Sequence, residues 1–423
     1  MLQETQDGDG LFVERVAALD IGKAEVVCCA RVPDPSRPGR RAQEVATYST
    51  MTRSLQALAD RLRALRVARV VMEATSDYWK PVFYLLEAAG FEVWLVNARD
   101  VKHLPGRPKT DTIDAVWLCK VAERGMLRPS FVPPEPIRLL RDLTRYRIDL
   151  IGERTREKNR VEKLLEDAQI KLSVVASDIF GASGRDMMQA LIAGQRDPKT
   201  LAQLARTRMR GKIPALEEAF VGRFSDHHAF LLAKMLARID ALDADITAVE
   251  TRIEDLLAPF ADALARLDAI PGIGRTAAAT LIAEIGVDMT RFPTAGHLAS
   301  WAKFTPIVSQ SAGKTKGTNA TGKGNRYLAR TLGEAVVGAA RTDTFLGERY
   351  RRLTRRRGTK KAIVAVGRSI LIIIWHLLAD PDSEFVDLGP THYETSRGTQ
   401  RAVRNHIRGL QALGYTVTLH PAA

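Results

Sequence analysis

Four acidic residues in the first third of the chain have the types and positions of a divalent-metal site. Asp20 and Glu73 each end a short apolar run, and Asp111 and Asp114 follow three residues apart. Residues three apart share one face of a helix, so both side chains would lie on the same side. Carboxylates are ligands that Mg²⁺ prefers, and a Mg²⁺ site of this kind can act on a phosphodiester. These four acids are therefore predicted to be catalytic metal ligands.

The elements that would position these acids follow a recognisable order. The pattern predicts strands at 16–22, 25–32 and 44–49, then helix 54–65, strand 69–73, helix 81–89, strand 92–97 and a helix opening near Asp111. Three strands followed by alternating helix and strand is the order of an RNase H-like (RuvC-like) α/β fold. In that fold, acids at the end of the first strand, on the fourth strand and on a later helix converge.

Prolines and helical periodicity indicate the division of the chain. Pro133, Pro134 and Pro136 close the first domain near residue 135. Long amphipathic helices are predicted at 137–168 and 229–258, and each needs a partner within the chain or on another subunit. The expected domains are 1–135, a helical coiled-coil or dimerisation region 136–265, a mainly α-helical C-terminal domain 266–385 and a tail 386–423.

A Pro-Gly-Ile-Gly turn at 271–274 lies between two predicted helices, an arrangement typical of a helix-hairpin-helix. In that motif the glycines allow close backbone approach, and amides at the second helix's N-terminus bind a phosphate. Gly272, Gly274 and Arg275 are therefore predicted to bind nucleic acid. The alternative is a plain helical turn with a glycine cap.

The net charge of +14 is concentrated in one region. Residues 291–361 contain sixteen Lys and Arg against three acids. Such a block attracts a polyanion through counterion release, with little dependence on its sequence. A solvated basic face with no partner is the competing interpretation.

A polar, glycine-punctuated loop at 304–325 lies inside this basic region and contains Ser311. A serine there could attack a phosphodiester while nearby cations neutralise the transition state. The expected nucleic-acid ligands in the loop are Lys314, Lys316, Lys323 and Arg326. From the residues alone, Ser311 could equally be an ordinary loop serine.

Taken together, these motifs resemble the DEDD transposases of the Piv/MooV-like insertion-sequence recombinases, the group that works with a bridge RNA. The resemblance is carried by five segments in a fixed order. They are Ala18-Leu-Asp-Ile-Gly-Lys23, Met72-Glu-Ala-Thr75, Lys109-Thr-Asp-Thr-Ile-Asp-Ala115, Ile270-Pro-Gly-Ile-Gly274 and Gly324-Asn-Arg-Tyr-Leu328.

The resemblance implies a DNA transposase with a Mg²⁺-binding tetrad (Asp20, Glu73, Asp111 and Asp114) and a nucleophilic serine in the C-terminal domain. Where the family reads Gln-Ser-Gly-Gly, this chain reads Gln310-Ser-Ala-Gly313, which favours Ser311 over Ser309 and Ser300. Implied partners are the DNA of the element ends and target, and a bridge RNA. The long helices would serve dimerisation, so a homo-oligomer is expected, with the site completed across subunits.

Three other functions compete with this prediction. A Holliday-junction resolvase would use the same acids with water and no serine. An actin-like ATPase could use the turns Asp20-Ile-Gly22 and Asp387-Leu-Gly389, but it would leave the basic block unexplained. A non-enzymatic scaffold would need only nucleic-acid binding, with Asp111 serving as a helix cap.

Localisation and redox chemistry are constrained by composition. The longest apolar run, Ser369–Asp380, is too short to cross a bilayer, so a soluble, cytoplasmic protein with no membrane partner is expected. Cys28, Cys29 and Cys119 have no metal-ligand spacing and are expected to be small core residues.

Overall fold

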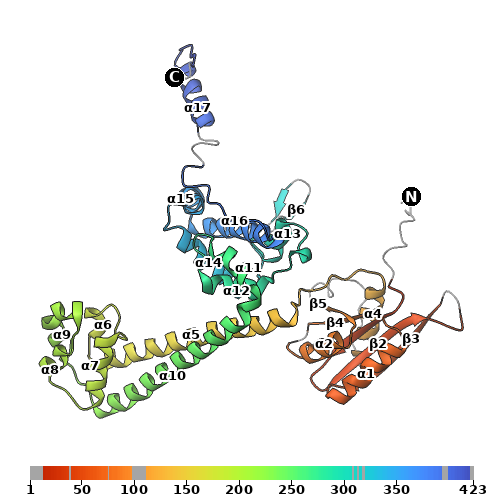
Figure 1. Cartoon of the computed structure of the whole chain (residues 1–423), viewed down its shortest axis with the longest axis horizontal. Helices are drawn as coiled ribbons and strands as arrows, with labels where there is room; N and C mark the ends of the chain where they lie inside the picture. The colour runs from red at the N-terminus through yellow and green to blue at the C-terminus, as the bar shows by residue number, and fades with distance from the viewer. Residues whose placement is uncertain are drawn as a thin grey trace. The chain divides into compact units, whose positions relative to one another are not determined.

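The computed structural model describes residues 13–37, 40–74, 76–97, 111–306, 309–311, 314–316, 320–392 and 399–419 (Figure 1). Within this set, 111–112, 309–311, 314–316 and 399–402 are described by their backbone alone. The chain divides into two compact units, Met1–Val132 and Pro133–Ala423. The further division of the second unit at residues 265 and 385 stays a prediction.

The first unit is built on a five-stranded mixed sheet with strand order β3-β2-β1-β4-β5. Strand β1 (Val16–Ile21) pairs antiparallel with β2 (Glu25–Pro33), which pairs antiparallel with β3 (Arg41–Ser49). On its other side β1 is parallel to β4 (Arg69–Glu73), and β4 is parallel to β5 (Glu92–Val96). The predicted three strands followed by alternating helix and strand are confirmed.

Helices cover both faces of this sheet because alternate strand residues are apolar on each side. On one face Leu19 and Met72 pack with α1 (Thr52–Ala64) and α2 (Trp79–Ala88). On the other face Val16, Ala18 and Val71 pack with Ala115, Leu118 and Cys119 of helix α4 (Asp111–Glu123). All three cysteines are buried, as expected, and burial raises the pKa of Cys28 to about 12.

The second unit begins with a long helical hairpin of α5 (Glu135–Asp167) and α10 (Asp226–Leu257). The two predicted long helices are therefore confirmed, and they pack on each other along their length (Figure 1). Three side-chain contacts fix an antiparallel arrangement: the ion pairs Arg147–Glu250 and Arg154–Asp243, and a hydrogen bond between Asp167 and His228. Short helices at the tip of the hairpin enclose a core of their own: α6 (Leu172–Val175), α7 (Ala182–Ile192), α8 (Pro198–Gln203) and α9 (Ile213–Ala219).

At the base of the hairpin, the first turns of α5 join a second core through Ile137 and Leu140. This core is formed by helices α11 (Ala261–Asp268), α12 (Arg275–Ile285), α13 (Ala295–Trp301), α14 (Arg326–Ala339), α15 (Phe345–Arg357) and α16 (Thr359–Ala379). The predicted loop after Phe304 contains a short hairpin of β6 (Ser309–Ser311) and β7 (Lys314–Lys316). Helix α17 (Thr399–Ala412) follows near the C-terminus.

Helix α16 is longer than its apolar run suggested. It has 21 residues with a window of mean hydropathy 2.1, so by length and composition it could cross a membrane. The length argument made from Ser369–Asp380 was therefore wrong. Eight of its residues are buried, and six of them, including Val366, Ile370 and Ile374, belong to the helical core.

Candidate active site and nucleic-acid surface

Asp20 and Glu73 lie at the carboxyl ends of neighbouring parallel strands. The register pairs Leu19 of β1 with Met72 of β4, so the next position on each strand is Asp20 and Glu73. Residues paired in a parallel register point to the same face of a sheet. Because Leu19 and Met72 lie on the α1 and α2 face, both acids belong to the opposite face, which α4 covers.

Helix α4 runs antiparallel to β1 on this face. Near its end, Cys119 Sγ donates to the carbonyl of Val16 at 3.5 Å, and the carbonyl of Glu123 accepts from the Val13 amide at 3.1 Å. The last turns of α4 therefore lie beside the start of β1. Its first turn, with Asp111 and Asp114, is directed toward the end of β1 that carries Asp20.

A buried ion cluster fixes the far end of α4. Glu123 is only 4% exposed, and its carboxylate pairs with Arg31 of β2 at 3.0 Å and Arg41 of β3 at 2.5 Å. Two strands thus hold the helix through one side chain. This contact sets the position of the helix along the sheet, and hence of the turn that carries the two acids.

Asp20, Glu73 and Asp114 are thus brought to one side and one end of the sheet from three separate elements. Among the side chains that the structure describes, no group of three or more Asp, Glu, His or Cys is close enough to hold a metal ion. The Asp111 side chain lies outside the described residues. The oxygen donors suit a hard cation such as Mg²⁺ in type.

The predicted serine lies in the β6–β7 hairpin of the second unit. Cα of Ser311 pairs with Lys314 across the hairpin, and Ser309 pairs with Lys316. An isolated bridge between Pro306 and Thr321 closes the base of the loop. The side chains of Ser309, Ser311, Lys314 and Lys316 lie outside the described residues, whereas Ser300 is exposed on α13.

Asn325 anchors the end of this loop. Its Oδ1 accepts hydrogen bonds from the amides of Tyr327 and Leu328 at 3.0 and 3.2 Å, which caps the N-terminus of α14. Its Nδ2 donates to Glu284 of α12 at 2.5 Å. The next residue, Arg326, is exposed and donates to the Tyr327 hydroxyl, and Lys323 just before the cap is also exposed.

Glu284 is the centre of a network that prediction from the sequence missed. Its side chain is fully buried and accepts two hydrogen bonds from Arg145 of α5, at 2.7 and 2.8 Å. Arg141 donates to the carbonyls of Ala283 and Glu284, both at 2.9 Å. Burial alone would lower the pKa of Arg145, but the hydrogen bonds and charge of Glu284 outweigh it and raise that pKa. An acid inside the apolar run 281–285 was the available signal.

The Pro-Gly-Ile-Gly turn connects α11 to α12 as expected, but its two glycines differ. Gly272 has φ +87°, and a β-carbon there would lie 2.1 Å from the carbonyl oxygen of Ala335 in α14. Gly274 is the N-cap of α12, and a β-carbon there would meet nothing within 4 Å. Arg275 is paired with Glu254 of α10, its Nε lying 3.0 Å from Oε1. Gly272 therefore serves helix packing, and phosphate binding by this turn stays a prediction.

Replacing Gly272 with Ala is expected to lower the free energy of unfolding by about 2–4 kcal/mol, because the methyl group overlaps α14 and the backbone is left-handed. Urea denaturation followed by circular dichroism measures this change. Gly274→Ala is the matched control and should change stability by less than about 0.5 kcal/mol. Equal effects of the two substitutions would contradict the packing role.

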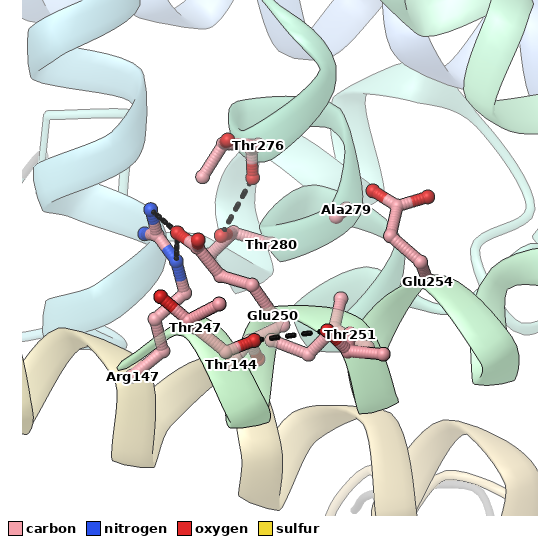
Figure 2. Close-up of a pocket in the computed structure, with 10 residues that line it drawn as sticks. Thr144, Arg147, Thr247, Glu250, Thr251, Glu254, Thr276, Ala279 and Thr280 are labelled. Atoms are coloured by element: carbon pink, nitrogen blue, oxygen red, sulfur yellow. Dashed lines mark hydrogen bonds and ion pairs between the residues drawn. The ribbon is translucent and has the colours of Figure 1, made fainter. Parts of the chain in front are cut away.

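A groove of about 390 Å³ lies between α5, α10 and α12, next to this turn (Figure 2). Five threonines line it, and four of their hydroxyls donate to carbonyls of their own helices, as with Thr280 to Thr276 at 3.0 Å. Arg147 and Glu250 pair with each other across it, Nε to Oε1 at 2.7 Å. These polar groups are satisfied within the chain, so the groove itself indicates no ligand.

Comparison with known proteins yields the same family at both ends of the chain. A family model described as a transposase, of the DEDD type of IS110, matches residues 17–170. A second, described as a transposase of the IS116/IS110/IS902 family, matches residues 264–351.

Two relatives come from insertion elements of Streptomyces. The uncharacterized 43.6 kDa protein of insertion element IS110 from Streptomyces coelicolor (strain ATCC BAA-471 / A3(2) / M145) is 26% identical over 298 residues, covering 65% of this chain and 72% of the relative. The uncharacterized 44.8 kDa protein of insertion element IS116 from Streptomyces clavuligerus is 26% identical over 327 residues, covering 70% and 78%.

Proposed function

We propose that the chain is an IS110-family insertion-sequence transposase, and that it cuts and rejoins DNA with a serine nucleophile and an acidic, Mg²⁺-binding site. DNA recombination is the activity of the family. The finer assignment concerns the residues: Ser311 as the nucleophile and Asp20, Glu73, Asp111 and Asp114 as the metal ligands.

The observation that carries this assignment is the position of Asp20 and Glu73. Two acids in successive register on parallel strands, facing a helix that begins with two more, suit an RNase H-like metal site. Transposases of the DEDD type use divalent metal ions. Bound there, Mg²⁺ would polarise the scissile phosphodiester.

Serine chemistry accounts for rejoining. The Ser311 oxygen attacks phosphorus, the bond to one deoxyribose oxygen breaks, and that oxygen takes up a proton. The resulting phosphoserine ester keeps the bond energy, so a hydroxyl of a second DNA can attack it and release the serine. Lys314, Lys316, Lys323 and Arg326 would neutralise the phosphate during both steps.

Partners follow from the same assignment. DNA is the substrate, and we infer that a bridge RNA supplies sequence recognition by base pairing, which leaves backbone and shape to the protein. Gly274 and the first amides of α12 would contact a phosphate in a helix-hairpin-helix manner. The acids and the serine belong to different units, so a homo-oligomer that completes each site across subunits is part of the proposal.

The test is a denaturing-gel assay for a covalent protein–DNA adduct. Protein co-expressed with its native flanking DNA is incubated with labelled element ends, with Mg²⁺ or with EDTA, and with or without prior ribonuclease treatment. We expect an adduct that needs Mg²⁺ and RNA, with mass spectrometry locating the phosphate on Ser311. DNA cleavage without an adduct would instead favour the resolvase function, and a phosphate on Ser309 or Ser300 would reassign the nucleophile.

A further inference from the structure

Seven consecutive exposed residues, 355–361, form the corner between α15 and α16. Five of them are cations, and we name them the cation corner: Arg355, Arg356, Arg357, Lys360 and Lys361. Gly358 makes the turn with φ +78°. The corner lies beyond residue 351, where the match to the second transposase family model ends.

The cation corner is the densest group of exposed cations without an ion pair in the described part of the basic region. Elsewhere in that region, Arg330 pairs with Glu334 at 2.9 Å, and Arg351 pairs with Glu348 at 3.0 Å. Within the described part of the chain, none of the five corner cations has an ion pair or a hydrogen-bonded side chain. Among the described residues Lys303 and Lys323 are also exposed and have no ion pair, so what distinguishes the corner is the density of such cations, five within seven residues.

Only some of these five cations stabilise the helices in which they lie. Arg355, Arg356 and Arg357 are in the last turn of α15, where cations interact favourably with the helix dipole. Lys360 and Lys361 are in the first turn of α16, which contains no acid, so they oppose its dipole and repel the arginines. An external anion would remove that repulsion.

The direction of α16 places the cation corner at the end of this helix where the loop of residues 304–325, which contains Ser311, leaves the helical core. Trp375 Nε1 donates to the carbonyl of Phe292 at 2.8 Å. Eight residues earlier in the helix, a β-carbon at Gly367 would lie 2.6 Å from Cε1 of Phe304. The segment from Phe292 to Phe304 therefore runs antiparallel to α16 and enters the loop toward the helix's N-terminus. From Gly367 to Lys360 is roughly 10 Å of helix.

We propose that the cation corner binds the phosphate backbone of the DNA duplex that flanks the phosphodiester attacked by Ser311. This assignment rests on the function proposed above. Arginine guanidinium groups can contact phosphate oxygens in pairs, and the two lysines add mobile point charges. A contact of this kind positions the duplex without reading its sequence, as suits a protein whose sequence recognition is delegated to RNA.

The test measures the salt dependence of DNA binding with the double variant R355Q/R356Q. Fluorescence anisotropy follows a labelled 30-base-pair duplex of the element end over a salt series. Loss of two phosphate contacts should reduce the slope of log K against log salt by about 1.8. Between 50 and 200 mM salt, the variant should then lose about tenfold less affinity than the natural protein. The same salt series is repeated with a single-stranded RNA of equal length, which distinguishes binding of DNA from binding of RNA.

The matched control is R208Q/R210Q, which removes the same two charges from exposed positions in the 3₁₀ turn Thr207–Lys212 of the hairpin tip. Its slope should equal that of the natural protein. A slope lowered equally by both variants, or lowered only on RNA, would overturn the assignment.

Binding and chemistry are separated by the covalent-adduct assay. With R355Q/R356Q, adduct yield should fall about tenfold at limiting DNA and recover at saturating DNA, because the nucleophile is intact. Unchanged yield at limiting DNA would argue against a role beside the reacting phosphate. Failure of the serine mechanism would instead remove the adduct from the natural protein and leave the salt slopes as predicted.

Discussion

Asp20→Asn and Ser311→Ala proteins are each expected to lose strand exchange by at least about 10³-fold, which is the scale of removing an essential catalytic group. The asparagine keeps the size of Asp20 but removes the charge that a divalent cation needs, and the alanine deletes the attacking oxygen. Labelled product on a denaturing gel measures the loss. Mixing the two inactive proteins should restore part of the activity, because an oligomer can combine an intact acidic site with an intact serine.

Two controls separate chemistry from folding. Asp60→Asn, on the exposed face of α1, and Ser300→Ala, on the exposed face of α13, should keep full activity. Strand cleavage that survives in the Ser311→Ala protein would contradict the serine mechanism and favour hydrolysis by water. Mixtures that stay inactive would contradict completion of the site across subunits, while leaving the roles of both residues in place.

Glu284→Ala is expected to lower the free energy of unfolding of the second unit by about 3–5 kcal/mol, because the change removes a fully buried carboxylate and leaves Arg145 and the more deeply placed Arg141 without their counter-ion. It also removes the acceptor that holds Asn325 at the N-terminus of α14. Chemical denaturation, followed by circular dichroism, measures the loss. The serine hairpin ends at Lys316, nine residues before Asn325, so adduct formation should fall even where the protein is still folded.

Glu334→Ala provides the comparison for this substitution. Glu334 also pairs with an arginine, Arg330, but its side chain is 68% exposed, and an exposed pair contributes only about 0–1 kcal/mol. If both variants lost a similar free energy of unfolding, burial of the acid would not determine the size of the loss. Rescue of adduct formation by Glu284→Gln, which keeps an acceptor for Asn325, would identify the hydrogen bond as the positioning contact.

Local patterns were sufficient to predict much of the fold. Short apolar runs identified the strands of the first unit, and the ends of two of them located Asp20 and Glu73, which directly follow the paired residues Leu19 and Met72 of β1 and β4. Helical periodicity identified α5 and α10 to within three residues at each end. These elements depend on residues that are close together in the sequence, so the local sequence is enough to predict them.

Features that depend on distant partners were not predicted. Arg145 and Glu284 are 139 residues apart, and nothing near either of them indicates the other. Gly272 was assigned to phosphate binding from its motif, whereas the backbone of α14 explains why no larger residue fits. The choice among Ser311, Ser309 and Ser300 depends on the position of a reacting phosphate, which the folded chain alone does not define.

Helix α5 belongs to two cores at once, and this gives it a mechanical property. Its 33 residues form a continuous rod about 50 Å long. Near one end of the helix, Arg141 and Arg145 donate hydrogen bonds to Glu284. Near the other end, the helix packs into the core at the tip of the helical hairpin through Val161, Leu164 and Leu165. In the proposed oligomer, a second subunit that bound the tip would transmit a torque along this helix to Glu284, which holds Asn325. Assembly would then be coupled to the alignment of the serine hairpin through the stiffness of one helix.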